Sequence, residues 1–242
     1  MKKILRQVAI IGASTAFLSP VAFADGTVGF DDNKIYFGIE GGYSAPAKGK
    51  FKDEGAVGKL KGTGVIEGKV GYMFYPGIAV EVAYGYRPNY DLKLEFPAAP
   101  FAPLQDPRSK VKVASHSVLV SLVYFAQPNG KFTPYFTVGA GYAHVTPKYA
   151  KIDAMYPALG RIKVGYIKKH VSERIAIRGG AGVLTELTPN LHLTTGVKLE
   201  VVNKIGLHAD FINPGTGAFV RSSSLKKTIG VVEFTAGLRV SL

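Results

Sequence analysis

The last twelve residues of the chain, 231–242, sort their side chains by parity. Every second residue from Val232 to Leu242 is apolar, whereas the intervening set carries the charges of Glu233 and Arg239. Successive side chains of a β-strand point to opposite faces, so this stretch predicts a strand with one apolar and one polar face. The fold must therefore place apolar surroundings against one face of this strand and polar surroundings against the other.

The same alternation predicts eight strands. They are expected near residues 34–44, 64–75, 78–88, 111–125, 132–146, 172–186, 191–202 and 228–242. Each has the length that a tilted strand needs to cross a bilayer. No apolar run after residue 24 is long enough for a membrane-spanning helix.

The connections alternate between short and long. Short turns are expected at Pro76–Gly77, 126–131 and 188–190, and long irregular segments at 45–63, 89–110, 147–171 and 203–227. Strict alternation predicts an all-β, antiparallel up-and-down meander with every long segment at one end. Eight such strands can close into a transmembrane barrel that has no open edge.

Charges within these strands fall on one face, opposite rows of large apolar residues. This polar set is Glu40, Glu67, Lys69, Glu81, Arg174, Arg178, Lys198, Glu200, Glu233 and Arg239. The remaining residues on that face are mostly Gly, Ala, Ser and Thr, and the set balances five acids against five bases. A soluble barrel would place the apolar rows inside, but small residues with balanced charges favour a crowded lumen that holds a network of ion pairs.

Aromatic residues gather near the expected strand ends. Tyr36, Phe37, Phe74, Tyr75, Tyr124, Phe125, Phe132 and Tyr135 lie toward the short turns, and Tyr43, Tyr84, Tyr86 and Tyr142 toward the long segments. Two aromatic belts are typical of the two interfaces of a membrane barrel. The apolar face is therefore expected to meet lipid.

The first residues predict export. Lys2, Lys3 and Arg6 precede an apolar run over 8–18 and a small-residue cleavage site ending at Ala24. We expect a signal peptide over 1–24, a short periplasmic segment over 25–33 and the barrel over 34–242. The chain has no cysteine, so no disulfide can support it.

The stretch Pro134–Tyr142 (PYFTVGAGY) and the final strand resemble the small outer-membrane barrels of the OmpA/OmpX kind from Gram-negative bacteria. The basic loops and overall pattern are also similar to rickettsial adhesin barrels. The resemblance implies a monomer in the outer membrane with its loops outside, in contact with membrane lipid and lipopolysaccharide. It also implies an assembly signal read by the outer-membrane insertion machinery, formed by Phe234, Leu238, Val240 and Leu242, where Leu242 replaces the usual final Phe.

The long segments carry much of the formal net charge of +13. Those at 45–63 and 147–171 contain Lys48, Lys50, Lys52, Lys59, Lys61, Lys148, Lys151, Arg161, Lys163, Lys168 and Lys169. An exported protein rarely meets nucleic acid, so we expect these residues to bind other polyanions. Neutralising lipopolysaccharide phosphates and binding a host glycan or protein remain open alternatives.

Catalytic and metal-binding patterns are weak. His116 is flanked by Ser115 and Ser117, which a strand directs to the opposite face, and no His or Cys pair has metal-ligand spacing. We expect no enzyme activity, no metal and no cofactor, with lipid modification as a remote alternative. The stronger alternative is a narrow channel for ions or small solutes, gated when lumen pairs such as Glu67 and Lys69 exchange partners.

Overall fold

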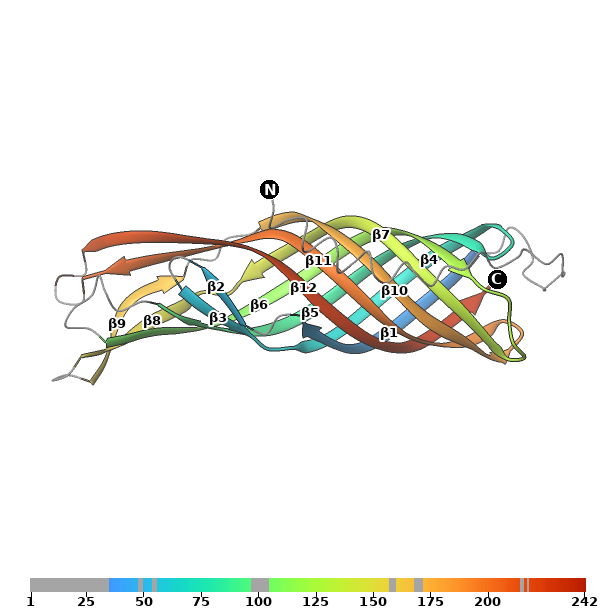
Figure 1. Cartoon of the computed structure of the whole chain (residues 1–242), viewed down its shortest axis with the longest axis horizontal. Coiled ribbons are helices and arrows are strands. Elements are labelled where there is room, and N and C mark those ends of the chain that lie inside the picture. The colour runs from blue at the N-terminus through green and yellow to red at the C-terminus, as the bar shows by residue number, and fades with distance from the viewer. Residues whose placement is uncertain are drawn as a thin grey trace.

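The structure is a computed structural model that describes residues 35–47, 50–53, 56–96, 105–156, 160–167, 172–213, 216 and 218–242 (Figure 1). Eight long strands form a ring: β1 (Ile35–Pro46), β4 (Thr63–Tyr75), β5 (Ile78–Glu95), β6 (Gln105–Phe125), β7 (Phe132–Pro147), β10 (Ser172–Thr188), β11 (Leu191–Ile212) and β12 (Phe219–Ser241). Four shorter strands are β2 (Lys50–Asp53), β3 (Ala56–Leu60), β8 (Ala150–Tyr156) and β9 (Gly160–Ile167). Within these ranges no helix is long and apolar enough to cross a membrane. The expected leader and periplasmic segment lie outside the described residues.

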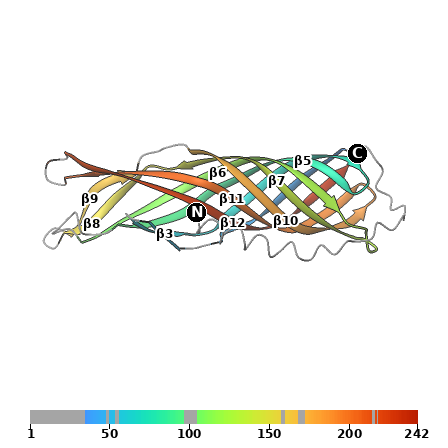
Figure 2. The same ribbon diagram turned by 45° about the horizontal axis from the view of Figure 1, so that its top comes forward.

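The ring is closed and antiparallel, as predicted. Each long strand pairs with the next one in the series, and β1 pairs with β12 from Tyr36 opposite Ser241 to Pro46 opposite Val231. Since both neighbours of every ring strand are present, the backbone hydrogen bonds of the wall are satisfied without a free edge. Figure 2, turned by 45°, shows the strands crossing the barrel axis at a tilt.

The short connections lie together at one end of the barrel, near the C-terminus, and we call this the turn end (Figure 1). Gly77, in the turn between β4 and β5, has a φ of 75°, and Gly130, between β6 and β7, has a φ of 62°. Glycine adopts this left-handed conformation without the steric cost that a side chain would add. All long connections lie at the opposite end.

The long connections, expected to be irregular, are largely β-structure, which corrects that prediction. The β5–β6 and β11–β12 hairpins continue beyond the ring, β8 and β9 fill the space between β6 and β11, and β2–β3 pairs beside β5. Together, β2, β3, β8, β9 and the strand parts at 90–95, 105–113, 205–212 and 219–230 form what we call the extension. The alternation of apolar and polar residues was not recognised in these segments because the strand register shifts between Arg87 and Tyr90 and between Val202 and Ile205. Beyond each shift, the inward-facing residues have the opposite parity.

Phe96, just after the end of β5, is buried in the extension, where its ring meets that of Phe211 edge-on at 5.3 Å. Residues 97–104 lie outside the described part of the chain.

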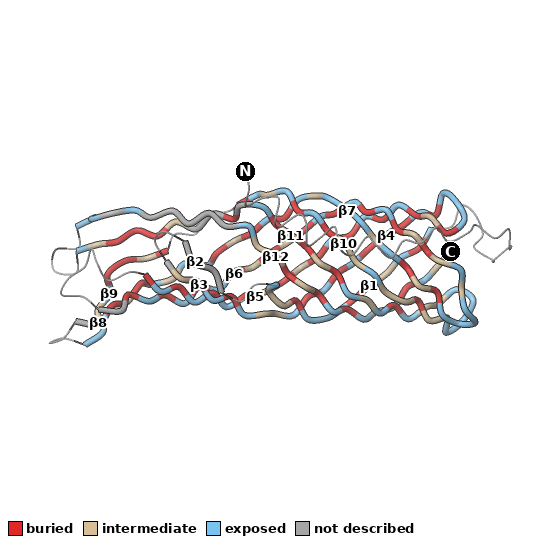
Figure 3. The backbone as a smooth tube through the Cα atoms, viewed as in Figure 1, coloured by how far each residue is buried: buried red, intermediate tan, exposed pale blue. Residues whose placement is uncertain are grey.

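Buried and exposed residues alternate along the ring strands (Figure 3). Glu233 has no exposed surface, whereas its neighbour Phe234 is 54% exposed. The outward side chains are large and apolar along every ring strand, including Ile39, Ile66, Val82, Val120, Val138, Ile177, Val197 and Leu238. Water would not tolerate an apolar surface of this extent, so the outer wall requires an apolar surrounding.

Candidate functional site

Charged side chains form a continuous chain of ion pairs across the lumen, which we call the ion chain. It begins where Arg87 donates from Nε to Glu233 Oε1 at 2.5 Å and from Nη2 to Glu200 Oε2 at 2.7 Å. Arg178 also donates to Glu200 Oε2, at 2.8 Å, and through Nη1 to Glu67 Oε2 at 2.5 Å. Because Glu200 serves both guanidinium groups, it joins β5 to β10 through β11.

The ion chain continues toward the turn end through two lysines. Lys198 Nζ donates to Glu67 Oε1 at 2.5 Å and to Glu40 Oε2 at 2.6 Å. Lys69 donates to Glu40 and lies 3.7 Å from Glu81. Acid and base therefore alternate along the whole path, and each carboxylate bridges or approaches cations from different strands. Buried charges persist only when they are paired in this way.

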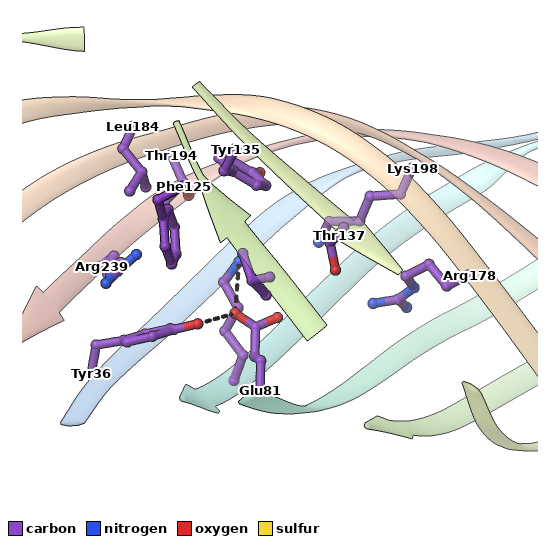
Figure 4. Close-up of a pocket in the computed structure, with 12 residues that line it drawn as sticks. Tyr36, Glu81, Phe125, Tyr135, Thr137, Arg178, Leu184, Thr194, Lys198 and Arg239 are labelled. Carbon is purple, nitrogen blue, oxygen red and sulfur yellow. Dashed lines mark hydrogen bonds and ion pairs between the residues drawn. The ribbon is translucent and has the colours of Figure 1, made fainter. Parts of the chain in front are cut away.

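Arg239 ends the path through an aromatic contact. Tyr36 donates from its hydroxyl to Glu81 at 3.0 Å, and the guanidinium of Arg239 lies 3.6 Å from the centre of the Tyr36 ring (Figure 4). Phe125 packs near the same guanidinium, at 4.6 Å. The aromatic faces stabilise this buried cation by a cation–π interaction.

The structure adds Arg87 to the lumen charges that the sequence predicts. Nine of the predicted residues are buried together in the lumen: Glu40, Glu67, Lys69, Glu81, Arg178, Lys198, Glu200, Glu233 and Arg239. The tenth, Arg174, is on the lumen side of β10 and is half-buried, toward the extension. Arg87 was missed although it shares the parity of Glu81.

Glycines in the wall make room for the large lumen side chains. A Cβ on Gly71 would lie 2.1 Å from the Tyr36 ring, and one on Gly182 or Gly196 would lie 2.6 Å from the Tyr135 hydroxyl. These positions must stay small because each ring lies flat over the neighbouring wall strands: Tyr36 is paired with Gly71, and Tyr135 is paired with Gly182, which is in turn paired with Gly196. The small residues that the sequence places on this face thus have a packing role.

The two predicted aromatic belts are only partly correct. Tyr36, Phe125 and Tyr135 point into the lumen, where they form a buried cluster at the turn end with Met73, Ala79, Val123 and Leu184. Other members of the belts are on the outer surface, including Phe37, Phe74, Tyr75, Phe132, Tyr43, Tyr84 and Tyr142. The cavity between the buried cluster and the ion chain measures about 10 Å³, room for about one water molecule.

A second, apolar cavity of about 50 Å³ lies on the other side of the ion chain, toward the extension. Arg87 and Glu200 contribute polar atoms to its lining, and the other lining residues are mostly apolar, including Leu92, Val113 and Val202. The lumen therefore has a charged middle between two mainly apolar zones.

A basic recess lies on the outer side of the extension, where β6, β8 and β9 pair. Arg108, Lys110, Lys151 and Arg161 line it together with Ser109 and Asp153, and its volume is about 570 Å³. The Ser109 hydroxyl donates to the carbonyl of Lys151 at 2.8 Å, and Arg108 lies opposite Asp153 in the sheet. The recess thus holds four cations and one carboxylate. The pairing of β6 with β8 fixes the backbone that carries most of them.

The predicted polyanion-binding residues are spread over the extension and its base. Lys59, Lys61, Lys148, Lys151, Arg161 and Lys163 are exposed, Lys50 and Lys52 belong to β2, and Lys48, Lys168 and Lys169 lie outside the described residues. The structure brings Lys151 and Arg161 together with Arg108 and Lys110. The last two were missed because they were assigned to an irregular segment whose charges were not considered.

The remaining predicted features are on the outer wall or apart from one another. Phe234, Leu238, Val240 and Leu242 are all exposed on the outside of the barrel. His116 faces outward while Ser115 and Ser117 face the lumen. Among the described residues, no three His, Cys, Asp or Glu side chains are grouped so that they could hold a metal ion.

Comparisons with known proteins agree with this architecture. Residues 10–211 match the family described as "Outer membrane protein beta-barrel domain". The uncharacterized protein RP788 of Rickettsia prowazekii (strain Madrid E) is 26% identical over 180 residues, which cover 72% of this chain and 97% of that protein.

Two solved structures share the fold. Neisserial surface protein A has a TM-score of 0.51 and 14% identity, covering 85% of this chain and 96% of its own. OprG of Pseudomonas aeruginosa has a TM-score of 0.51 and 15% identity, covering 87% and 97%. The closed eight-stranded ring, its apolar outer wall and the family match together show that the chain belongs to the outer-membrane β-barrel family.

Proposed function

We propose that this protein is a surface barrel of the Gram-negative outer membrane whose extension faces the cell exterior and binds acidic polysaccharide. The observation that carries the proposal is the basic recess, in which Arg108, Lys110, Lys151 and Arg161 surround an open space with one carboxylate, Asp153. Phosphate and sulfate groups are the ligands that such a cluster of cations attracts.

The recess is suited to a polymer because its cations come from three paired strands. Arg108 and Lys110 are two residues apart on β6, on the same face, and Lys151 and Arg161 extend that face onto β8 and β9. Backbone pairing fixes the spacing of these strands, so little order has to be created on binding. Arginine adds paired N–H donors that match two oxygens of one sulfate or phosphate group.

Lipopolysaccharide and a host glycosaminoglycan offer the same anionic groups. The first would make the recess part of the packing of the outer leaflet, and the second would make the protein an adhesin. Binding of each polymer to the purified barrel can be measured separately, and the comparison shows which of the two supplies the anionic groups.

The test compares two triple variants of the barrel in detergent. Lys110→Gln, Lys151→Gln and Arg161→Gln together remove three positive charges from the recess, while Lys59→Gln, Lys61→Gln and Lys93→Gln remove three exposed positive charges from the extension and its base. Affinity for a heparin oligosaccharide and for purified lipopolysaccharide is measured at low and physiological salt. We expect the recess variant to lose about tenfold or more in affinity for one of them, because its three cations line one common space. The control variant should lose only a fraction of that, because its charges are outside the recess and act only as separate exposed charges.

Equal losses in the two variants would contradict a defined recess and indicate diffuse attraction by net charge. If neither polymer binds the unmodified barrel, the proposed function is wrong.

The packed lumen supports a structural role for the ion chain in preference to a channel. The cavity on the turn-end side of the ion chain has room for about one water molecule, and the aromatic cluster of Tyr36, Phe125 and Tyr135 lies beyond it. An eight-stranded barrel has an interior that side chains just fill.

A further inference from the structure

The outer wall of the barrel carries one row of polar side chains at the level where its apolar surface ends. Tyr86 on β5 lies opposite His116 on β6, His116 lies opposite His144 on β7, and His144 lies opposite Glu173 on β10. All four point outward, since the residues between them face the lumen. We call Tyr86, His116, His144 and Glu173 the rim row.

Direct contacts join the members of the rim row. Tyr84, the next outward residue on β5, has its hydroxyl 2.6 Å from His116 Nδ1, and the Tyr86 ring stacks on the His116 ring at 4.6 Å. The rings of His116 and His144 are 6.3 Å apart, and His144 Nδ1 is 3.7 Å from Glu173 Oε1. The two imidazoles are thus held beside each other by aromatic and carboxylate neighbours.

Three members of the rim row, His116, His144 and Glu173, line a recess of about 260 Å³. Its other lining residues are Val118, Tyr142 and Ala143, and Tyr142 is 69% exposed. The recess therefore offers polar nitrogen atoms on one side and an apolar, aromatic floor on the other. A lipid presents a matching pair of surfaces, a charged headgroup and the first carbons of its chains.

The level of the rim row is defined by β6. On the turn-end side, the outward residues Val118, Val120 and Leu122 are apolar and about half exposed, whereas the outward residues on the other side are the small Ala114 and then Lys112 and Lys110. In a bilayer the apolar band of a barrel ends where the headgroups begin. The rim row therefore lies at the depth of the lipid phosphates.

We propose that the rim row, together with Tyr84, is a binding site for the phosphate group of a lipid in the adjoining leaflet, and that protonation of His116 and His144 tightens it. This site is separate from the basic recess and does not depend on the function proposed for it.

Protonation changes the site in two ways. Imidazoles gain a positive charge within the range of pH 5 to 8, and each then has two N–H donors. The contact with Tyr84 occupies Nδ1 of His116 in both charge states, with the hydroxyl donating to the neutral ring and accepting from the charged one, so Nε2–H remains a donor. Phosphate oxygens are strong acceptors for such charged donors.

Other charged and titratable groups near His116 and His144 determine the net charge of the site before the histidines are protonated. Tyr84 and Tyr86 face it from β5 and Glu173 from β10, while Lys112 lies four residues before His116 on β6 and Lys148 just after the end of β7. With neutral histidines the rim row carries one negative charge, that of Glu173. With both histidines protonated, Glu173 can pair with His144, and the row then carries one positive charge.

The test measures lipid retention by native mass spectrometry of the full barrel in detergent. A short-chain phosphatidic acid is compared with phosphatidylcholine at about pH 5.5 and about pH 7.5, because histidine as a residue type can change charge between these values. We expect retention of phosphatidic acid to rise about fivefold at the lower pH, an increase typical of adding charge pairs at a partly solvated site. Phosphatidylcholine should show a smaller increase.

The double variant His116→Gln and His144→Gln should lose the increase, while His208→Gln, on the β11 part of the extension, should keep it. Inorganic phosphate tests the assignment to a lipid: it should not displace bound phosphatidic acid at equal concentration, because it lacks chains for the Tyr142 floor. Retention that is independent of pH, unchanged in the double variant or abolished by inorganic phosphate would overturn the proposal. Unaltered heat-dependent migration of each variant on gels shows that it has folded.

Discussion

Strand β6 passes through two regions with opposite side-chain chemistry. In the barrel its lumen side carries Ser117 and Ser121 and its outer side carries Val118 and Val120; in the extension its inner side carries Val111 and Val113 and its outer side Lys110 and Lys112. Odd residues face inward throughout, so the geometry of the strand does not change. What changes is the surrounding medium: hydrocarbon around the barrel wall and water around the extension.

The two regions are therefore stabilised differently. The extension has an ordinary hydrophobic core, in which Leu94, Ile152, Val164 and Ile167 are almost fully buried, and removal of that apolar surface from water favours folding. The barrel lumen has no such core at its middle level. There the ion chain links the walls, so its stability depends on every buried charge having a partner.

The largest effect is expected from Glu200→Gln. Glu200 is the carboxylate between Arg87 and Arg178, at 2.7 and 2.8 Å, and it is 1% exposed. The amide keeps the shape but leaves two buried guanidinium groups facing each other with one acid fewer. We expect a loss of about 3–5 kcal/mol in the free energy of unfolding, the usual cost of breaking a buried pair.

This loss can be measured by urea unfolding in phospholipid vesicles, followed by circular dichroism because the chain has no tryptophan. The matched control is Glu95→Gln on the same kind of strand in the extension. Equal stability of the unmodified barrel and the Glu200 variant would mean that the ion chain does not hold the lumen together.

A smaller effect is expected from Gly182→Ala, which adds one methyl group to the crowded lumen. The new Cβ would lie 2.3 Å from the carbonyl oxygen of Thr195 and 2.6 Å from the Tyr135 ring, so the wall or the ring must move. Overpacking of this kind costs about 1–3 kcal/mol. The control is Gly68→Ala on the outer face, where a Cβ meets nothing within 4 Å and no loss is expected. Thermal shifts of the two variants in the same detergent test the difference, and a loss of similar size in both would contradict the crowding argument.

The membrane part of this fold could be predicted from the sequence because the alternation repeats in every strand and the lumen charges balance between strands. Parity alone places all ten predicted charges on the lumen side, and it would also have found Arg87, which is six residues after Glu81 on the same face. Tyr36 and Tyr135 share the parity of lumen residues too. They were assigned to the aromatic belts because position along the strand was given more weight than face.

The strands of the extension could not be predicted from the sequence in the same way. At its base the apolar face changes from the outer to the inner side, and the register shifts near Arg87 and Val202 move the phase of β5 and β11 as well. A search for one continuous pattern therefore stops at the membrane boundary. The pairing of β8 and β9 with β6 and β11 depends on contacts between distant segments, which no local pattern specifies.

The smallest effect is expected from the exposed pair Lys59 and Glu95, which sharpens the contrast with the ion chain. Their charged atoms are 3.9 Å apart and both side chains are 46% exposed, so water and salt screen the attraction. Lys59→Gln or Glu95→Gln should change the free energy of unfolding by about 0.5 kcal/mol or less. Added salt should reduce even that difference, while leaving the large deficit of the Glu200 variant nearly unchanged, because the lumen pairs are shielded from bulk ions. The Glu95 variant could instead lose as much free energy of unfolding as Glu200→Gln. In that case burial would not distinguish the two kinds of ion pair, and the ionic lumen and the apolar-cored extension would not differ in how they are stabilised.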